Sequence, residues 1–159
     1  MAARAPFTLG VARDGDHDVV TIAGVIDETS DLAPLARLGE RAIVVDLRGV
    51  RRINSYGVRV WLDAIRALPR TAPLTFVHAP PPVVDQCNMV AGFLGHGALA
   101  SFYAPMTCRE CDESVDRLFD VAACRAAAGK LPDSPCPRCK RPMEIDDLEE
   151  QYLSFVRDG

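Results

Sequence analysis

Four cysteines in the last third of the chain occur as two pairs, each with two residues between the cysteines. The pairs are Cys108 with Cys111 and Cys136 with Cys139, and they bracket residues 112–135, a span of 24 residues. A CxxC turn brings two thiolates within reach of one ion, and two such turns complete a tetrahedron of sulfurs. Both turns must then meet at one point, so the sequence predicts a four-cysteine metal centre.

Zinc is the metal that we expect there, in a structural role. A shell of four thiolates leaves no position for water or substrate, so metal binding mainly stabilises a segment too small to hold itself together. An iron site or redox-active dithiols are the alternatives. Cys87 and Cys124 have no partner at ligand spacing and are interpreted as buried small hydrophobic residues.

The composition is that of a soluble globular protein, with 48% hydrophobic and 25% charged residues. No apolar run approaches the ~20 residues that a membrane span needs, so we expect no membrane insertion. Residues 1–10 lack the pattern of a signal peptide, which predicts a cytoplasmic location. Thiols stay reduced in the cytoplasm, and paired cysteines there are more often metal ligands than disulfides.

The net charge of −4 lies entirely in the cysteine-bearing segment. Residues 1–103 have ten basic and ten acidic side chains, whereas residues 104–159 have eight basic and twelve acidic ones. An acidic segment repels phosphate backbones. Nucleic acid is therefore an unlikely main partner.

Alternating strand and helix patterns occupy residues 7–103. The run at residues 42–47 is apolar except for Asp46, as in a strand buried on both faces, and we place it centrally in a sheet. The alternation predicts an α/β fold, a mixed sheet with helices packed on it in one layer. The expected strands are residues 7–13, 19–26, 42–47, 74–79 and 98–103, and the expected helices are residues 32–38, 54–68 and 83–94.

The sequence changes character at Pro105, where the cysteine-bearing segment begins. We therefore predict one domain over residues 1–104 and a small zinc module over residues 105–159. Residues 146–156 have the apolar spacing of an amphipathic helix that closes the module.

The second cysteine pair lies in the run Pro135-Cys136-Pro137-Arg138-Cys139, followed by Arg141-Pro142-Met143-Glu144. This segment resembles a bacterial zinc ribbon, and the resemblance covers about the last third of the chain. Zinc ribbons serve nucleic-acid binding, protein contacts and plain structural stapling alike. The resemblance thus implies a metal but no particular function.

Residues 42–65 resemble the STAS domain, the fold of anti-sigma-factor antagonists and of sulfate-transporter tails. The family has a buried strand ending in Asp-Leu, a short loop, and Asp-Ser-Ser-Gly-Leu opening a helix. The equivalents here are Asp46-Leu47 and Asn54-Ser55-Tyr56-Gly57-Val58. Residues 22–27 resemble the family's strand before its first helix, so the likeness extends over roughly residues 7–103.

The resemblance implies partner switching at the turn before this helix. In the family, a kinase-like anti-sigma factor binds near the turn and phosphorylates the serine before the glycine. A phosphate at a helix N-terminus is tolerated by the fold, but its charge disrupts an interface. The implied partner-binding residues here are Asn54, Ser55, Tyr56, Gly57 and Arg59.

This chain differs from the family at the phosphorylated position, because Tyr56 precedes the glycine. Ser55 and Tyr56 are the candidate phosphorylation sites. Each has a second interpretation: Ser55 as a helix cap or first-turn hydroxyl, and Tyr56 as an exposed contact residue. Four arginines surround the turn, namely Arg48, Arg51, Arg52 and Arg59. Three interpretations of them stay open: a solvated face, a surface for an acidic partner, and a site for a small anion.

We expect a non-enzymatic protein-interaction module in bacterial signalling or regulation, similar to an anti-sigma-factor antagonist. Its partner would be a protein, such as an anti-sigma factor or kinase-like regulator. The sequence has no Gly-rich phosphate loop and no nucleophile elbow, and His17, His78 and His96 have no evident acidic partner. The alternative is a nucleic-acid-associated regulator that recognises DNA or RNA with the zinc ribbon. A thiol oxidoreductase is the enzyme class to test.

Overall fold

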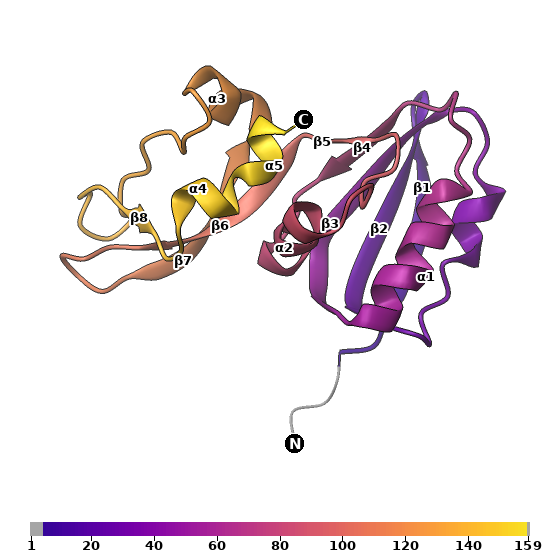
Figure 1. The fold of residues 1–159 in the computed structure, drawn as a ribbon, viewed down its shortest axis with the longest axis horizontal. Coiled ribbons are helices and arrows are strands. Elements are labelled where there is room, and N and C mark those ends of the chain that lie inside the picture. Colours follow the sequence, from indigo (N-terminus) through magenta and orange to yellow (C-terminus); the bar gives the residue numbers. More distant parts are fainter. Residues whose placement is uncertain (1–4, 159) are drawn as a thin grey trace.

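The computed structural model describes residues 5–158 as two small sheets joined by one continuous stretch of chain (Figure 1). The first sheet has the strand order β1-β2-β3-β4-β5, and the second has the order β7-β6-β8. Helices pack on the first sheet, and four close cysteines lie in the second unit. The predicted α/β class, with a mixed sheet followed by a small cysteine module, is confirmed.

The first sheet begins with a hairpin and continues with parallel strands. β1 and β2 pair antiparallel around Gly15, whose φ of 57° suits a tight turn. β2, β3, β4 and β5 then pair parallel, with β3 at the centre as predicted. The strands are β1 (Thr8–Asp14), β2 (His17–Ile26), β3 (Ala42–Ile53), β4 (Leu74–Val77) and β5 (Ala98–Leu99).

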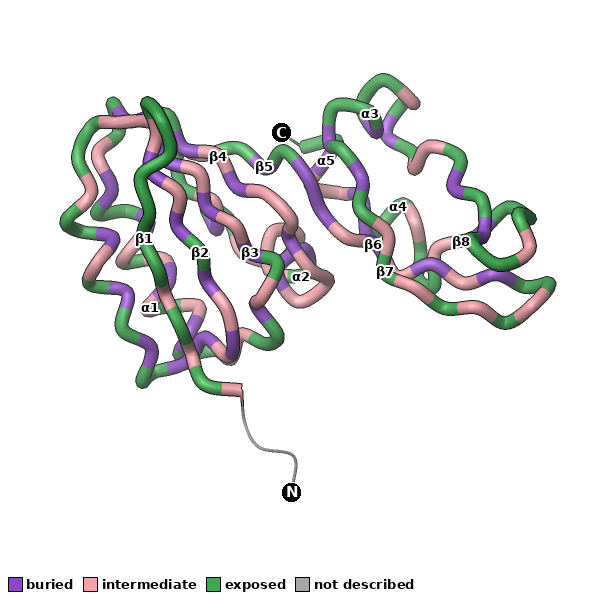
Figure 2. The backbone as a smooth tube through the Cα atoms, turned by 180° about the vertical axis from the view of Figure 1, so that it is seen from behind, coloured by how far each residue is buried: buried purple, intermediate pink, exposed green. Residues whose placement is uncertain are grey.

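Helices cover only one face of this sheet. Alternate residues of β2 and β3, such as Val20, Ile22 and Val45, are fully buried on the helix side. Viewed from behind, β1, β2 and β3 have no helix in front of them (Figure 2). We call this side, which bears the side chains of Val44 and Asp46, the open face. The covering elements are the 3₁₀ helix η1 (Ala33–Arg37), α1 (Ser55–Arg66) and α2 (Pro81–Met89).

The second unit contains the cysteine module. The four cysteines lie at one end of its antiparallel sheet. Its last two helices return toward α2 and contact it. The elements are β6 (Ser101–Thr107), β7 (Ser114–Asp120), α3 (Val121–Ala126), β8 (Glu144–Ile145), α4 (Glu149–Tyr152) and α5 (Ser154–Arg157).

The two sheets are joined with only Ala100 between β5 and β6. Beyond the end of β4, Ala79 forms a parallel bridge with Phe102, and the Tyr103 N–H donates to the Ala79 carbonyl at 2.8 Å. Main-chain pairing therefore continues from one sheet into the other. β6 runs uninterrupted across positions 104 and 105, where the sequence places a domain boundary, and that boundary stays a prediction.

Helix α2 holds the second unit against the first. The Asn88 side chain donates to the Tyr152 carbonyl and accepts from the Phe155 N–H, both at 2.9 Å. These are main-chain groups where α4 gives way to α5, at Leu153. The Tyr152 hydroxyl in turn donates to the Tyr103 carbonyl of β6. The module is thus packed on the larger unit by specific polar contacts as well as by apolar burial.

Several elements differ in length from the sequence prediction. β3 extends to Ile53 because β2 pairs with it that far, through two register shifts. α2 stops at Met89, and the loop after it supplies the Phe93 carbonyl that accepts the buried Trp61 indole N–H at 2.8 Å. The single helix predicted over residues 146–156 is two short helices. The Asn88 side chain bonds to the main chain at the point where the hydrogen bonds of the helix are interrupted. No helix in residues 5–158 is long and apolar enough to cross a membrane.

Asn88→Ala should lower the free energy of unfolding by about 1–3 kcal/mol, because two main-chain groups lose their partner at the junction. Urea denaturation of the full chain measures this change. Met89→Ala is the matched control, since Met89 is the next residue and is 69% exposed. Equal stability of the two variants would contradict the role assigned to Asn88.

Candidate functional site

The four paired cysteines converge at the end of the second sheet. Cys108 and Cys111 lie in the turn between β6 and β7, and Cys136 and Cys139 lie in the loop before β8. All four Sγ atoms lie within 4.8 Å of one another. The Sγ atoms of Cys108 and Cys139 are 3.5 Å apart, and those of Cys111 and Cys136 are 3.6 Å apart.

The two cysteine turns have the same main-chain structure. In the first, the Asp112 N–H donates to the Cys108 carbonyl at 2.9 Å, and Asp112 has a φ of 57°. In the second, the Lys140 N–H donates to the Cys136 carbonyl at 2.9 Å, and Lys140 has a φ of 65°. The left-handed residue after each pair folds the chain back, so that both thiols of a pair face the same point.

The main chain also closes each turn from outside. The Cys108 N–H donates to the Glu113 carbonyl, and the Cys136 N–H donates to the Arg141 carbonyl, both at 2.8 Å. The four thiols are therefore held in position by hydrogen bonds at equivalent places in the two turns. A pre-formed cluster of this kind loses less conformational entropy when it binds an ion.

Two ion pairs cross from one cysteine turn to the other. Arg109, between the first two cysteines, lies 2.6 Å from the Glu144 carboxylate, and Arg138, between the second two, lies 3.9 Å from Glu113. Both pairs are largely exposed, so their contribution to stability is small. They connect the two cysteine turns through side chains that face solvent.

The chemistry of the four thiols fits a metal ion. The N–H groups of Cys139 and Arg138 lower the pKa of the Cys136 thiol to about 7, which favours the thiolate that binds metals. Although the Glu113 N–H opposes it, burial together with the neighbouring thiols raises the pKa of the Cys111 thiol to about 12, so a metal ion has to displace that proton when it binds. In a tetrahedron with metal–sulfur bonds of about 2.3 Å, the sulfurs are about 3.8 Å apart, close to the spacing found here. The four cysteines can therefore hold one ion with no position left for another ligand.

The other two cysteines lie outside the cluster. Burial raises the pKa of the Cys87 thiol to about 12 and that of Cys124 to about 11. Cys124 is fully buried in the apolar core. Neutral thiols in such surroundings are poor nucleophiles and poor ligands.

The turn from β3 into α1 carries the predicted partner-binding residues. Asn54 caps the helix, since its Oδ1 accepts the Gly57 N–H at 2.7 Å, while its Nδ2 donates to Glu28 at 3.2 Å. Asn54 is therefore the cap and Ser55 is the first residue of α1, so the interpretation of Ser55 as a cap is wrong and that as a first-turn hydroxyl is confirmed. Ser55 is exposed, and its hydroxyl has no protein partner within residues 5–158.

Gly57 fixes how closely this turn approaches the sheet. A Cβ on Gly57 would overlap the carbonyl oxygen of Ile26 at the end of β2. Tyr56, one residue earlier, points outward and is 68% exposed. A rigid main chain thus presents a large aromatic side chain to solvent, next to the exposed Arg59.

The arginines around the turn do not form ion pairs with the domain's own carboxylates. Arg51, Arg52 and Arg59 are exposed, and within the described part of the chain none of them lies in a salt bridge. Arg48 differs, because its guanidinium lies against the ring of His78. Three of the four arginines are therefore available to pair with an acidic partner or a small anion.

Sequence reasoning missed one polar cluster. It found no acidic partner for His78, but His78 Nδ1 lies 3.1 Å from Asp46 Oδ1, so that interpretation is wrong. Asp46 pairs with Val77 across β3 and β4, and His78 is the next residue. Alternation along β4 would send His78 to the face opposite Asp46, and the left-handed main chain of His78, with a φ of 57°, turns it back, so the sequence carried no signal for this pair.

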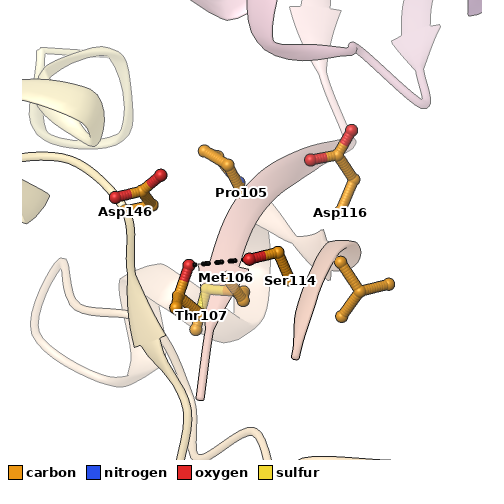
Figure 3. A pocket seen from close by; sticks show the side chains of 7 residues that line it. Pro105, Met106, Thr107, Ser114, Asp116 and Asp146 are labelled. Carbon is orange, nitrogen blue, oxygen red and sulfur yellow. Dashed lines mark hydrogen bonds between the residues drawn. The ribbon is translucent and has the colours of Figure 1, made fainter. Parts of the chain in front are cut away.

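A shallow groove of about 250 Å³ lies on the face of the second sheet (Figure 3). The carboxylates of Asp116 and Asp146 stand on either side of Pro105, and the Thr107 and Ser114 hydroxyls lie 3.4 Å apart below them. The Asp146 main chain donates to the Pro105 carbonyl at 2.7 Å. The groove is acidic, so this surface repels a phosphate backbone.

No protein-family model matches this chain, and no curated protein matches it either. The assignment of function therefore rests on the geometry described above.

Gly57→Ala should destabilise the protein by at least about 2 kcal/mol, because the added methyl group must displace the main chain of β2. Thermal unfolding followed by circular dichroism measures the loss. Gly10→Ala is the control, since a Cβ there meets no atom within 4 Å. A Gly57→Ala protein as stable as the control would show that the turn is not held against the sheet.

Proposed function

We propose that this chain is a STAS-like domain with a C-terminal zinc ribbon, and that it acts as a non-enzymatic protein-interaction module in bacterial signalling. The antiparallel hairpin, the three parallel strands that follow and the capped helix after β3 are consistent with the STAS resemblance. The partner would be a protein such as an anti-sigma factor or kinase-like regulator.

The exposure of Tyr56, on a turn held by a helix cap and a close main-chain contact, is the observation that carries the proposal. Its neighbours are held by the Asn54 cap and by the contact of Gly57 with Ile26. Binding of a partner therefore costs little main-chain conformational entropy at this turn. Tyrosine and arginine are the residues most often found at the energetic centre of protein interfaces. Tyr56 and Arg59 place one residue of each type on the same face of α1.

The ribbon has a structural part in this proposal. Zinc fits four thiolates in a closed shell, and the metal would fix the loop of residues 108–139 from which β8, α4 and α5 follow. The acidic groove and the acidic side chains near the second cysteine pair favour a protein contact over a nucleic-acid contact.

The purified full chain should contain one zinc ion per molecule, and Cys136→Ser should lose it. Elemental analysis and cobalt substitution, which gives thiolate charge-transfer absorption, measure the occupancy and ligand type. Cys124→Ser is the matched control, because Cys124 lies outside the cluster. Iron in the purified protein would contradict the zinc assignment. Cysteine pairs that cycle between thiol and disulfide without metal would contradict it as well.

Tyr56→Ala should weaken partner binding by about 1–3 kcal/mol while leaving the domain folded. The partner is found by cross-linking in cells and mass spectrometry, and its affinity is then measured by calorimetry. Asp63→Ala, an exposed change further along α1, is the control. A partner that is lost only in Cys108→Ser, with the first sheet still folded, would move recognition to the ribbon. Salt-dependent binding to DNA or RNA would favour the nucleic-acid alternative.

A further inference from the structure

Strand β1 forms a free edge of the first sheet. It is the first strand in the order β1-β2-β3-β4-β5, so within residues 5–158 only β2 pairs with it. Six of its seven residues, all except Leu9, are exposed (Figure 2). A Cβ placed on Gly10 would meet no atom within 4 Å, so no described residue covers the strand there. The edge is therefore open to another chain.

The register of the hairpin determines which main-chain groups of β1 face outward. Asp14 and His17 flank the two-residue turn, and residues that flank such a turn exchange hydrogen bonds. Hydrogen-bonded and non-hydrogen-bonded pairs alternate in an antiparallel ladder, so Gly10 and Ala12 also bond to β2. The remaining N–H and C=O groups point away from β2, and they belong to Leu9, Val11 and Arg13.

This edge lacks the features by which natural proteins protect an edge strand. Protected edges are commonly short or bulged, or they contain proline or lysine. β1 has seven residues without proline or lysine, and its pairing with β2 has no register shift. Its one cation, Arg13, lies 3.8 Å from Asp18 of β2. Val11, at the middle of the strand, is apolar and 46% exposed, so the edge is suited to pair with a further strand.

A second copy of β1 is complementary to this edge. In an antiparallel pair with a two-fold axis through Val11, Val11 lies opposite Val11 of the second copy, and Leu9 lies opposite Arg13 of the second copy. All three outward residues then exchange hydrogen bonds with their counterparts. Asp14 lies opposite Thr8 of the second copy, so the whole strand overlaps without placing like charges together. The two exposed valine side chains cover each other.

The other edges of the two sheets do not have this complementarity. β5 and β8 have two residues each. β7 is as long as β1, but three of its residues are charged. A two-fold pairing of β7 centred on Asp116 or Arg117 places that residue opposite itself, and one centred on Leu118 places Asp116 opposite Asp120. Like charges directly opposite each other destabilise a sheet, so within residues 5–158 only β1 can pair with its own copy along its full length.

We propose that β1 is a self-association surface, at which two copies of this chain pair antiparallel about a two-fold axis through Val11. The pairing joins the two five-stranded sheets into one continuous sheet. A strand edge is a small interface, so the dimer is weak and reversible, and its population depends on protein concentration.

This inference does not rest on the proposed partner surface. Tyr56 lies in the turn between β3 and α1, whereas the pairing uses the outer edge of β1. Tyr56→Ala should therefore leave self-association unchanged. A loss of partner binding in that variant, with the dimer intact, would separate the two surfaces.

Analytical ultracentrifugation of the purified full chain, over a range of concentrations, is the first test. We expect the mass to rise from that of one chain toward that of two. Val11→Pro removes an outward N–H that β2 does not use, and edge positions of this kind tolerate proline. Because two hydrogen bonds across the axis are lost, this variant should associate at least about tenfold more weakly. Val11→Thr keeps the N–H and the β-branched shape, so it should still associate.

Leu118→Pro is the matched control on the other long edge. The Val121 N–H donates to the Ala100 carbonyl at 2.9 Å, so the odd-numbered residues of β7 bond to β6 and the Leu118 N–H points outward. Leu118 is 48% exposed, much like Val11. The same change on β7 should leave the association constant unchanged.

Amide hydrogen exchange of the wild-type chain, measured residue by residue, is the second test. The N–H groups of Leu9, Val11 and Arg13 should exchange quickly in dilute protein and slow down as the dimer forms. Those of Gly10 and Ala12 should be slow throughout, because they bond to β2. This measurement decides the question even where Val11→Pro does not fold, which the fluorescence of Trp61, the single tryptophan, reports.

Four results would overturn the proposal. The first is a wild-type chain that stays monomeric up to about 1 mM. The second is a folded Val11→Pro protein that associates as strongly as the wild type. The third is exchange of the outward amides of β1 that does not depend on protein concentration. The fourth is protection of these amides only by a different protein, which would show that the occupant is not a second copy.

Discussion

The packing of Phe102 is the contact on which the arrangement of the two units depends. Phe102 is fully buried, bridges to Ala79 through the main chain, and contacts the rings of Phe119, Tyr152 and Phe155. One side chain is therefore shared by the end of the first sheet, the second sheet and the terminal helices. A small module that could not bury enough apolar surface alone gains a core by this attachment.

The two cysteine turns hold the opposite end of the same module. The cysteine turns repeat one main-chain pattern, with a left-handed residue after each pair and crossed ion pairs between the turns. The aromatic cluster holds one end of β6, at Phe102, and Cys108 directly follows its other end. The segment between Cys111 and Cys136, which contains β7, α3 and the irregular residues 127–135, is therefore fixed at both of its ends.

The central strand β3 positions two polar features of the first unit, the turn that carries Tyr56 and the Asp46–His78 pair. Its end leads into the Asn54 cap and the exposed Tyr56, and its middle places Asp46 beside His78. Alternation along the strand sends Val45 and Leu47 into the core and Asp46 to the open face. The same backbone that builds the core thus places polar groups on the other side at fixed spacing.

The sequence by itself determined the local features: the β1–β2 hairpin, the central position of β3, the α1 pattern and the pairing of cysteines. These depend on periodicity, turn residues and short spacings, which act over a few residues. The tertiary structure decided the rest. The insertion of Asn88 at Leu153 splits the last helix, and the pairing of β3 with β4 brings His78 to Asp46. Such contacts join residues that are 32 to 67 positions apart, and their partners become neighbours only when the whole chain has packed.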